Sequence, residues 1–151
     1  ETFRQCCEAF ERSRDNAALS SVGAELGESL YRQGRHDEAE RWADLAETHA
    51  PPGDLVTQFT WRSLRAKLLA IAGDLAEAER VGAHALDLVR GTDALVATGD
   101  VLLDTAEVQL CAGRPDEATS ALREALSLYE RKGSTASAAA AKLQFDALVV
   151  A

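Results

Sequence analysis

The stretch that decides the fold is GRHDEAERWADLA, residues 34–46, because it recurs twice further along the chain. The recurrences are GDLAEAERVGAHA at residues 73–85 and GRPDEATSALREA at residues 113–125. All three copies share the pattern Gly-x-x-x-Glu-Ala and a second Ala twelve residues after the Gly. The glycines are 39 and 40 residues apart, so the chain contains an internal repeat of nearly constant period.

Each copy predicts two antiparallel helices that meet at the Gly. Good helix formers fill the stretches before the glycines, and Gly takes the left-handed conformation that ends a helix more easily than other residues. These first helices are predicted at residues 18–33, 55–72 and 94–112. In the second helix, apolar residues recur at i, i+3, i+4 and i+7, as in Ala39, Trp42, Ala43 and Ala46. We also expect Asp74 and Glu77 to form a capping box at the start of one such helix.

Small residues and short corners indicate how the two helices of a copy pack. A small residue stands seven positions before each Gly, which lets two helix backbones approach closely: Gly27, Ala66 and Ala106. A corner of two or three residues forces the two helices to run antiparallel. The chain is therefore expected to be all-α, with about eight helices in one domain. This domain spans residues 1–151 and consists of a flanking helix at 2–13, repeats at 18–50, 54–90 and 93–132, and a capping helix at 134–150.

Composition narrows the functional classes. A chain of 151 residues with a net charge of −9 argues against binding nucleic acid through its phosphates. No stretch approaches the ~20 apolar residues of a membrane span. Three cysteines, two of them adjacent, cannot form a disulfide framework, which indicates a reducing, cytoplasmic location. The absence of Met and the Glu at position 1 suggest that the sequence is a piece of a longer protein.

Residue types that carry catalysis occur without the required spacing. The histidines show no metal-binding pattern and are expected to be solvated or capping: His36, His49 and His84. The cysteines form no C-x-x-C motif and are expected to be buried and unreactive: Cys6, Cys7 and Cys111. No Gly-rich phosphate-binding loop occurs. Arg62 and Arg65 share a helix face that Lys67 does not, a cluster too small for a nucleic-acid footprint. We therefore expect neither an enzyme nor a cofactor.

The repeats resemble the tetratricopeptide repeat (TPR) family. Copy one matches best, with the family's residues at the family's spacing: Leu26, Gly27, Tyr31, Gly34, Ala39, Ala46 and Pro51. Copies two and three have Arg90 and Glu130 at the closing Pro, and Gly82 replaces a usually large residue. The period also exceeds the usual ~34 residues. The chain thus resembles the longer-helix variety, and residues 121–142 look like the C-terminal end of arrays attached to NTPase modules of bacterial transcription regulators or to adenylate/guanylate cyclases.

The resemblance implies a right-handed α–α superhelix in which the first helix of each hairpin lines a concave groove. Candidate peptide-binding residues in that groove are Ser21, Glu28, Tyr31, Arg32, Thr60, Ser63, Lys67, Asp100 and Glu107. The family's clamp for a peptide carboxylate uses Lys and Asn at three pairs of positions. These positions hold Ala24 and Glu28, Ser63 and Lys67, and Leu103 and Glu107. Only Lys67 matches, so we do not expect that clamp.

Two functions follow from this reading. The first is a non-catalytic protein–protein interaction scaffold within a larger bacterial signalling or transcription regulator. Its partner would be a protein or peptide segment, which can belong to another domain of the same parent chain. The alternative is a sensory domain that binds a small ligand and controls an attached NTPase or cyclase. The sequence leaves open whether the groove or an edge is the binding surface.

Overall fold

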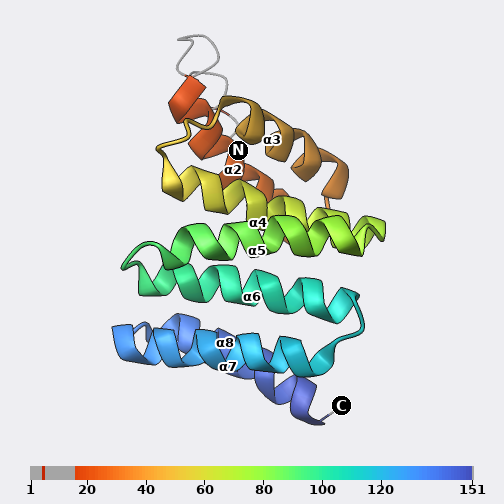
Figure 1. The fold of residues 1–151 in the computed structure, drawn as a ribbon, viewed down its shortest axis with the longest axis vertical. Coiled ribbons are helices and arrows are strands. Elements are labelled where there is room, and N and C mark those ends of the chain that lie inside the picture. Colours follow the sequence, from red (N-terminus) through yellow and green to blue (C-terminus); the bar gives the residue numbers. More distant parts are fainter. Residues whose placement is uncertain (1–4, 6–15, 151) are drawn as a thin grey trace.

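The computed structural model describes residues 5 and 16–150, and all regular structure in that part of the chain is helical (Figure 1). Residues 16–150 form seven helices: α2 (Asn16–Arg32), α3 (His36–His49), α4 (Leu55–Ala72), α5 (Leu75–Arg90), α6 (Leu95–Cys111), α7 (Pro115–Lys132) and α8 (Thr135–Val150). The predicted all-α class is confirmed. The predicted flanking helix at residues 2–13 lies, apart from residue 5, outside the described residues.

Consecutive helices pack as hairpins, and the hairpins stack along the long axis of the molecule (Figure 1). The hairpins are α2–α3, α4–α5 and α6–α7, and α8 packs against α7. Helix α4 also contacts α2 and α6, so the first helices of successive hairpins lie side by side. This arrangement is the predicted TPR-like solenoid.

The three predicted corners lie where the glycines place them. Gly34, Gly73 and Gly113 have positive φ values of 73°, 89° and 70°. After the second corner, the Asp74 carboxylate accepts a hydrogen bond from the backbone N–H of Glu77 at 3.3 Å and caps α5. The reciprocal half of the predicted capping box does not form: the Asp74 N–H donates to the carbonyl oxygen of Leu69 at 3.0 Å, and the Glu77 carboxylate binds Arg80. The cap therefore satisfies one of the free N–H groups of α5, rather than two.

Small side chains mark the places where helices meet. Ala39, Ala43 and Ala46 are fully buried in α3, as the periodicity of apolar residues predicts. A Cβ added at Gly27 would lie 2.5 Å from Cδ2 of Leu64, and one at Gly99 would lie 2.6 Å from Cε1 of Tyr129. Both glycines therefore permit a helix approach that Ala would obstruct.

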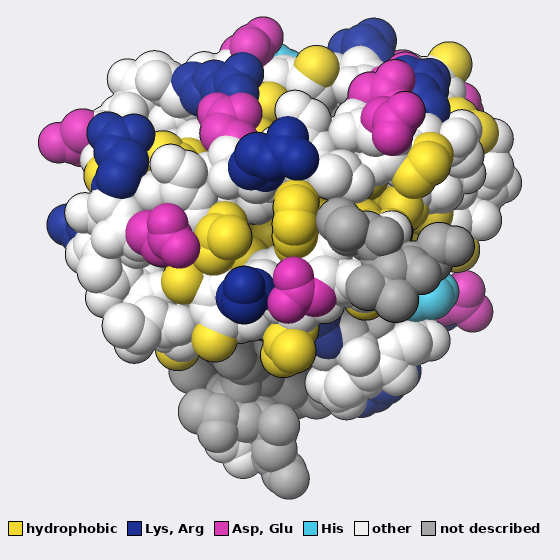
Figure 2. All heavy atoms as spheres, turned by 90° about the horizontal axis from the view of Figure 1, so that it is seen from below, with side chains coloured by type: hydrophobic (Ala, Val, Ile, Leu, Met, Phe, Trp, Pro, Cys, Tyr) yellow, Lys and Arg dark blue, Asp and Glu magenta, His cyan; other side chains and the backbone are white. Residues whose placement is uncertain are grey.

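Helix α8 covers the end of the stack on one side only. It buries Ala141 in the core cluster beside α7 and leaves Leu143 exposed. Figure 2 looks onto the α7–α8 end of the molecule, where hydrophobic side chains lie between interspersed basic and acidic ones. None of the described helices is long and apolar enough to cross a membrane.

Candidate functional site

The first helices of the three hairpins enclose a groove of about 740 Å³, here called the inner groove. Because α4 contacts both α2 and α6, one face of each helix borders the same space. The groove is lined by Glu25, Glu28 and Arg32 from α2, by Leu55, Val56, Phe59, Thr60 and Ser63 from α4, and by Thr92, Ala94, Ala97, Asp100, Val101, Leu103 and Asp104 from α6 and the turn before it.

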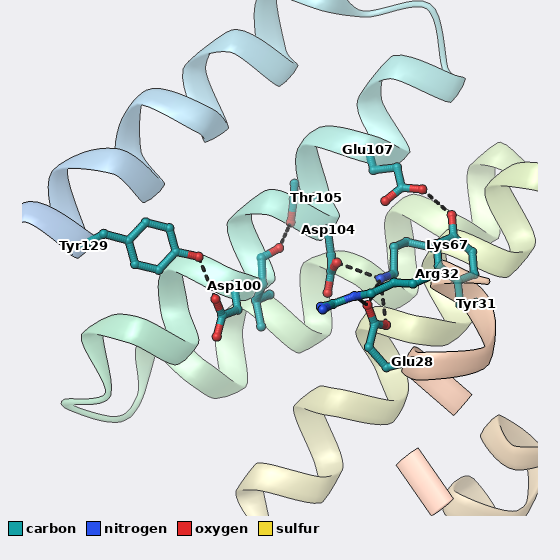
Figure 3. Close-up of polar contacts among 10 residues, drawn as sticks. Glu28, Tyr31, Arg32, Lys67, Asp100, Asp104, Thr105, Glu107 and Tyr129 are labelled. Carbon is teal, nitrogen blue, oxygen red and sulfur yellow. Dashed lines mark hydrogen bonds and ion pairs between the residues drawn. The ribbon is translucent and has the colours of Figure 1, made fainter. Parts of the chain in front are cut away.

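Five of the nine candidate groove residues line this space together: Glu28, Arg32, Thr60, Ser63 and Asp100. Ser21 lies in an adjoining hollow of about 210 Å³, where its hydroxyl is 2.7 Å from that of Thr57. The remaining three, Tyr31, Lys67 and Glu107, do not line the groove. They belong to a network of polar contacts, called here the inner network, that joins α2, α4 and α6 (Figure 3).

Lys67 is the centre of the inner network. Its Nζ lies 2.8 Å from Oε2 of Glu28 on one side and 2.8 Å from Oδ1 of Asp104 on the other. The same ammonium lies 4.5 Å from the centre of the Tyr31 ring, in a cation–π contact. The side chain is only 2% exposed, so Lys67 is a buried cation whose charge the protein itself already compensates.

Two tyrosines each donate a hydrogen bond to a carboxylate, one on either side of Lys67 (Figure 3). The Tyr31 hydroxyl donates to the carboxylate of Glu107, which lies 76 residues further along the chain. The Tyr129 hydroxyl, from α7, donates to Oδ1 of Asp100 at 2.6 Å. Residues from all three hairpins therefore hold one another in fixed positions beside the groove.

Acidic groups outnumber basic ones at this site. Among the residues drawn in Figure 3, four are acidic and two are basic, an excess of two negative charges when all are ionised: Glu28, Asp100, Asp104 and Glu107 against Arg32 and Lys67. Burial raises the pKa of Asp104 to about 6; Lys67 opposes this shift, whereas Glu28 and Glu107 add to it. Burial also raises the pKa of Asp100.

The buried lysine stays protonated. Burial lowers the pKa of Lys67, but Asp104 and Glu28 together outweigh burial and raise it above its usual value. At neutral pH the site therefore combines a protonated ammonium with more carboxylate groups than that ammonium can neutralise. Such an arrangement favours the approach of a further cation.

Sequence reasoning missed Asp104, which contacts Lys67 directly. A signal was present, because Asp100, Asp104 and Glu107 have the spacing i, i+4, i+7 of a single helix face. It also missed the apolar wall formed by Leu55 and Val56, which are 40% and 61% exposed.

The predicted burial of Cys111 was wrong. This cysteine is exposed, at the last residue of α6. Partial burial and the nearby Glu107 raise the pKa of its thiol, so it lacks the thiolate character of a reactive cysteine. Within the described residues, no group of three or more His, Cys, Asp or Glu side chains could hold a metal ion.

The outer surface of α4 carries the two arginines of the basic cluster. Arg65 pairs with Asp44 and Glu47 of α3. Arg62 stacks over the ring of Trp61 at 4.1 Å and donates from Nε to Nδ1 of His84 at 3.2 Å. The predicted separation of these arginines from Lys67 is confirmed.

Two protein-family models match parts of the chain. One tetratricopeptide repeat model matches residues 57–131, and a second tetratricopeptide repeat model matches residues 21–50. Together with the stacked hairpins, these matches show that the chain belongs to the tetratricopeptide repeat family. Members of this family are generally non-catalytic modules for protein–protein interaction. A search of the curated proteins gives no match.

Proposed function

We propose that the protein binds a peptide segment in the inner groove, and that the segment carries both apolar and basic side chains. The observation that carries this proposal is the pairing of an acidic excess with exposed apolar side chains in one groove. Exposed apolar side chains that are rimmed by charged ones are typical of protein-interaction grooves, and Leu55 and Val56 lie beside Glu25 and Glu28 in this way. The family's general role as an interaction module supports the same reading.

The apolar part of the groove lies at the start of α4. Leu55 and Val56 are exposed there, and Ala97 and Leu103 of α6 line the same groove. Apolar side chains of a partner, such as Leu or Val, would cover this surface. Each Å² of apolar surface removed from water contributes a favourable free energy of about 25 cal/mol. This contact would contribute affinity, with little preference for one apolar residue over another.

The acidic part of the groove supplies selectivity. Glu25 is exposed and lines both the inner groove and the adjoining hollow. Asp100 and Glu28 add negative charge nearby, and Arg32 is already paired with Glu28 at 2.9 Å. A Lys or Arg of the partner would meet this charge, whereas an acidic side chain would be repelled. Because the inner network holds these groups in place, little ordering is needed on binding.

A peptide array tests the proposal. The peptides would share a set of short apolar sequences, and each sequence would be made in three forms, flanked by Lys, Gln or Glu. Binding of the full chain to each peptide would be measured at low and at high salt. We expect the Lys series to bind, the Glu series to fail, and salt to weaken the Lys series. Glu25→Lys and Val56→Ser should each weaken binding several-fold, while the control Glu130→Lys, exposed on α7, should not. Equal binding by both groove variants and the wild type would exclude the inner groove.

We further propose that this module is cytoplasmic and serves a larger bacterial signalling or transcription regulator. The support is the resemblance of residues 121–142 to the C-terminal ends of repeat arrays in such proteins. In that setting the bound segment can belong to another domain of the same chain. Such intramolecular binding would be weakened by the groove variants above, and it would not change with protein concentration.

A further inference from the structure

A second hollow, of about 240 Å³, lies between α4, α5 and α6 and is called here the side pocket. Ser63 and Asp104 line both it and the inner groove, so they stand between the two spaces. Gly82 of α5 leaves this space open. The equivalent position, nine residues after the corner Gly, holds Leu122 in the third hairpin, and that leucine is fully buried in the core.

Two buried polar atoms at the side pocket have no hydrogen-bond partner among the described residues. They are Oγ of Ser63, a residue only 4% exposed, and Oε1 of Gln109. Buried polar atoms are nearly always paired in folded proteins, because an unpaired one loses its hydrogen bonds to water. Both residues line the side pocket, so a molecule inside it could supply the missing partners.

We propose that the side pocket binds a small, mainly apolar molecule that carries a hydroxyl or amine donor. The amide oxygen of Gln109 can only accept a hydrogen bond, so the ligand must donate one, and Ser63 can accept or donate a second. Ala66, Leu86 and Val108 supply apolar walls. A cavity of about 150 Å³ already admits benzene, so this space accommodates a substituted ring. This inference does not depend on peptide binding in the inner groove.

Charge at the pocket excludes acidic ligands. The carboxylates of Asp104 and Glu79 both line it. Arg114 pairs with Glu79, and Lys67 pairs with Asp104, so these bases are already engaged. A ligand carboxylate would therefore meet acceptors and negative charge, and none of the described residues that line the pocket is a Lys or Arg that could balance it.

Four probes of nearly equal size separate these contributions. Benzyl alcohol, benzylamine, toluene and benzoate share a ring and differ in the group they offer to Gln109 and Ser63. Binding to the full chain would be measured by ligand-observed NMR and by the shift in melting temperature. We expect the alcohol or the amine to bind at least about tenfold more tightly than toluene, and benzoate not to bind.

Variants locate the binding to this pocket. Gly82→Leu should fill the space and abolish binding. This variant should fold for two reasons. A Cβ at Gly82 would lie 3.4 Å from that of Ala66, and Leu has a higher helix propensity than the Gly it replaces in the interior of α5. The matched control, Ala76→Leu, changes an exposed residue of the same helix and should bind as the wild type does. Ser63→Ala and Gln109→Leu should reduce the preference for the alcohol over toluene, which provides a test should Gly82→Leu not fold.

Three results would overturn the proposal. Failure of all four probes to bind the wild type would mean that only water occupies the pocket. If neither benzyl alcohol nor benzylamine bound more tightly than toluene, or if benzoate bound, the unpaired polar atoms would have no role in binding. Unchanged binding by a folded Gly82→Leu variant would place the ligand elsewhere.

Discussion

Lys67 and Arg65 lie two residues apart on α4 and face opposite surfaces of the molecule. Lys67 faces inward and pairs with Glu28 and Asp104, which come from the hairpins before and after its own. Arg65 faces outward and pairs with Asp44 and Glu47, both exposed and both from α3. The inner cation is 2% exposed and the outer one 14%.

The difference shows that similar charges have different roles on the two surfaces. On the inner surface, water is displaced, so removing one charge leaves its partners buried and uncompensated. On the outer surface, water and salt screen each pair, and the loss of one side chain is easily accommodated. Inner charges therefore hold the hairpins at defined positions, whereas outer charges are largely replaceable.

The largest expected effect is the loss of the inner cation. Lys67→Met should lower the free energy of unfolding by about 3 kcal/mol, because Glu28 and Asp104 lose their common partner. Arg65→Met, the matched outer change, should cost about 1 kcal/mol or less. Urea denaturation followed by circular dichroism measures both. Similar losses for the two variants would contradict the distinction between the surfaces.

The second effect depends on pH. Burial raises the pKa of Asp104 from 3.8 to about 6, so between these values the folded protein holds a proton that the unfolded chain has released. The stability from this proton is complete below about pH 4 and is lost as pH rises through about 6.

Asp104→Asn isolates this contribution, because the amide stays neutral at every pH. The stability of the wild type relative to Asp104→Asn should fall by about 2 kcal/mol between about pH 4 and about pH 7. Denaturation curves at several pH values measure the difference. A relative stability that rises with pH would mean that Lys67 outweighs burial at this carboxylate.

The tyrosine hydroxyls should contribute less. Tyr31→Phe and Tyr129→Phe each remove one hydrogen bond to a carboxylate, at a cost of about 1 kcal/mol. The ring of Tyr31 also contacts Lys67, and Phe would keep that ring, so the coupling is measured with Tyr31→Leu, which combined with Lys67→Met should depart from additivity by at least about 0.5 kcal/mol. Tyr129→Phe has no such contact and should combine additively with Lys67→Met. Additivity in both cycles would argue against a connected inner network.

The smallest effect concerns an ion pair between hairpins on the outer surface. Arg90 of α5 and Glu124 of α7 approach to 2.7 Å, and both are about half exposed. Arg90→Ala should cost about 0.5 kcal/mol or less, and the difference should vanish in about 1 M NaCl, where screening is nearly complete. Thermal unfolding at two salt concentrations checks this expectation. A loss that persists at high salt would mean that Arg90 contributes through packing.

The architecture could be predicted from the sequence because its determinants are local and occur three times. Gly34, Gly73 and Gly113 each end a helix by themselves, and the spacing of Ala residues identifies the packed face. The position of Lys67 beside the groove follows from its register on α4. The burial of Lys67 could not be predicted in the same way. It depends on carboxylates from two other hairpins, and no local sequence pattern encodes how close those carboxylates come to Lys67.

Departures from the repeat consensus proved harder to interpret. Gly82 was recognised as unusual, but the side pocket it leaves is visible only when α4 and α6 are in place. Cys111 has the apolar character of a core residue, yet its place at a helix end exposes it.

The hydrogen bond from Tyr31 to Glu107 runs from the first hairpin to the third and bypasses the second. Solenoids usually transmit stability only between neighbouring repeats, so they can fray from one end or stretch like a spring. In this chain, separating α2 from α6 also requires that this contact be broken. The part from α2 to α6 is therefore expected to melt more cooperatively than stacking between neighbouring hairpins alone would allow, whereas α7 and α8 lie outside this constraint.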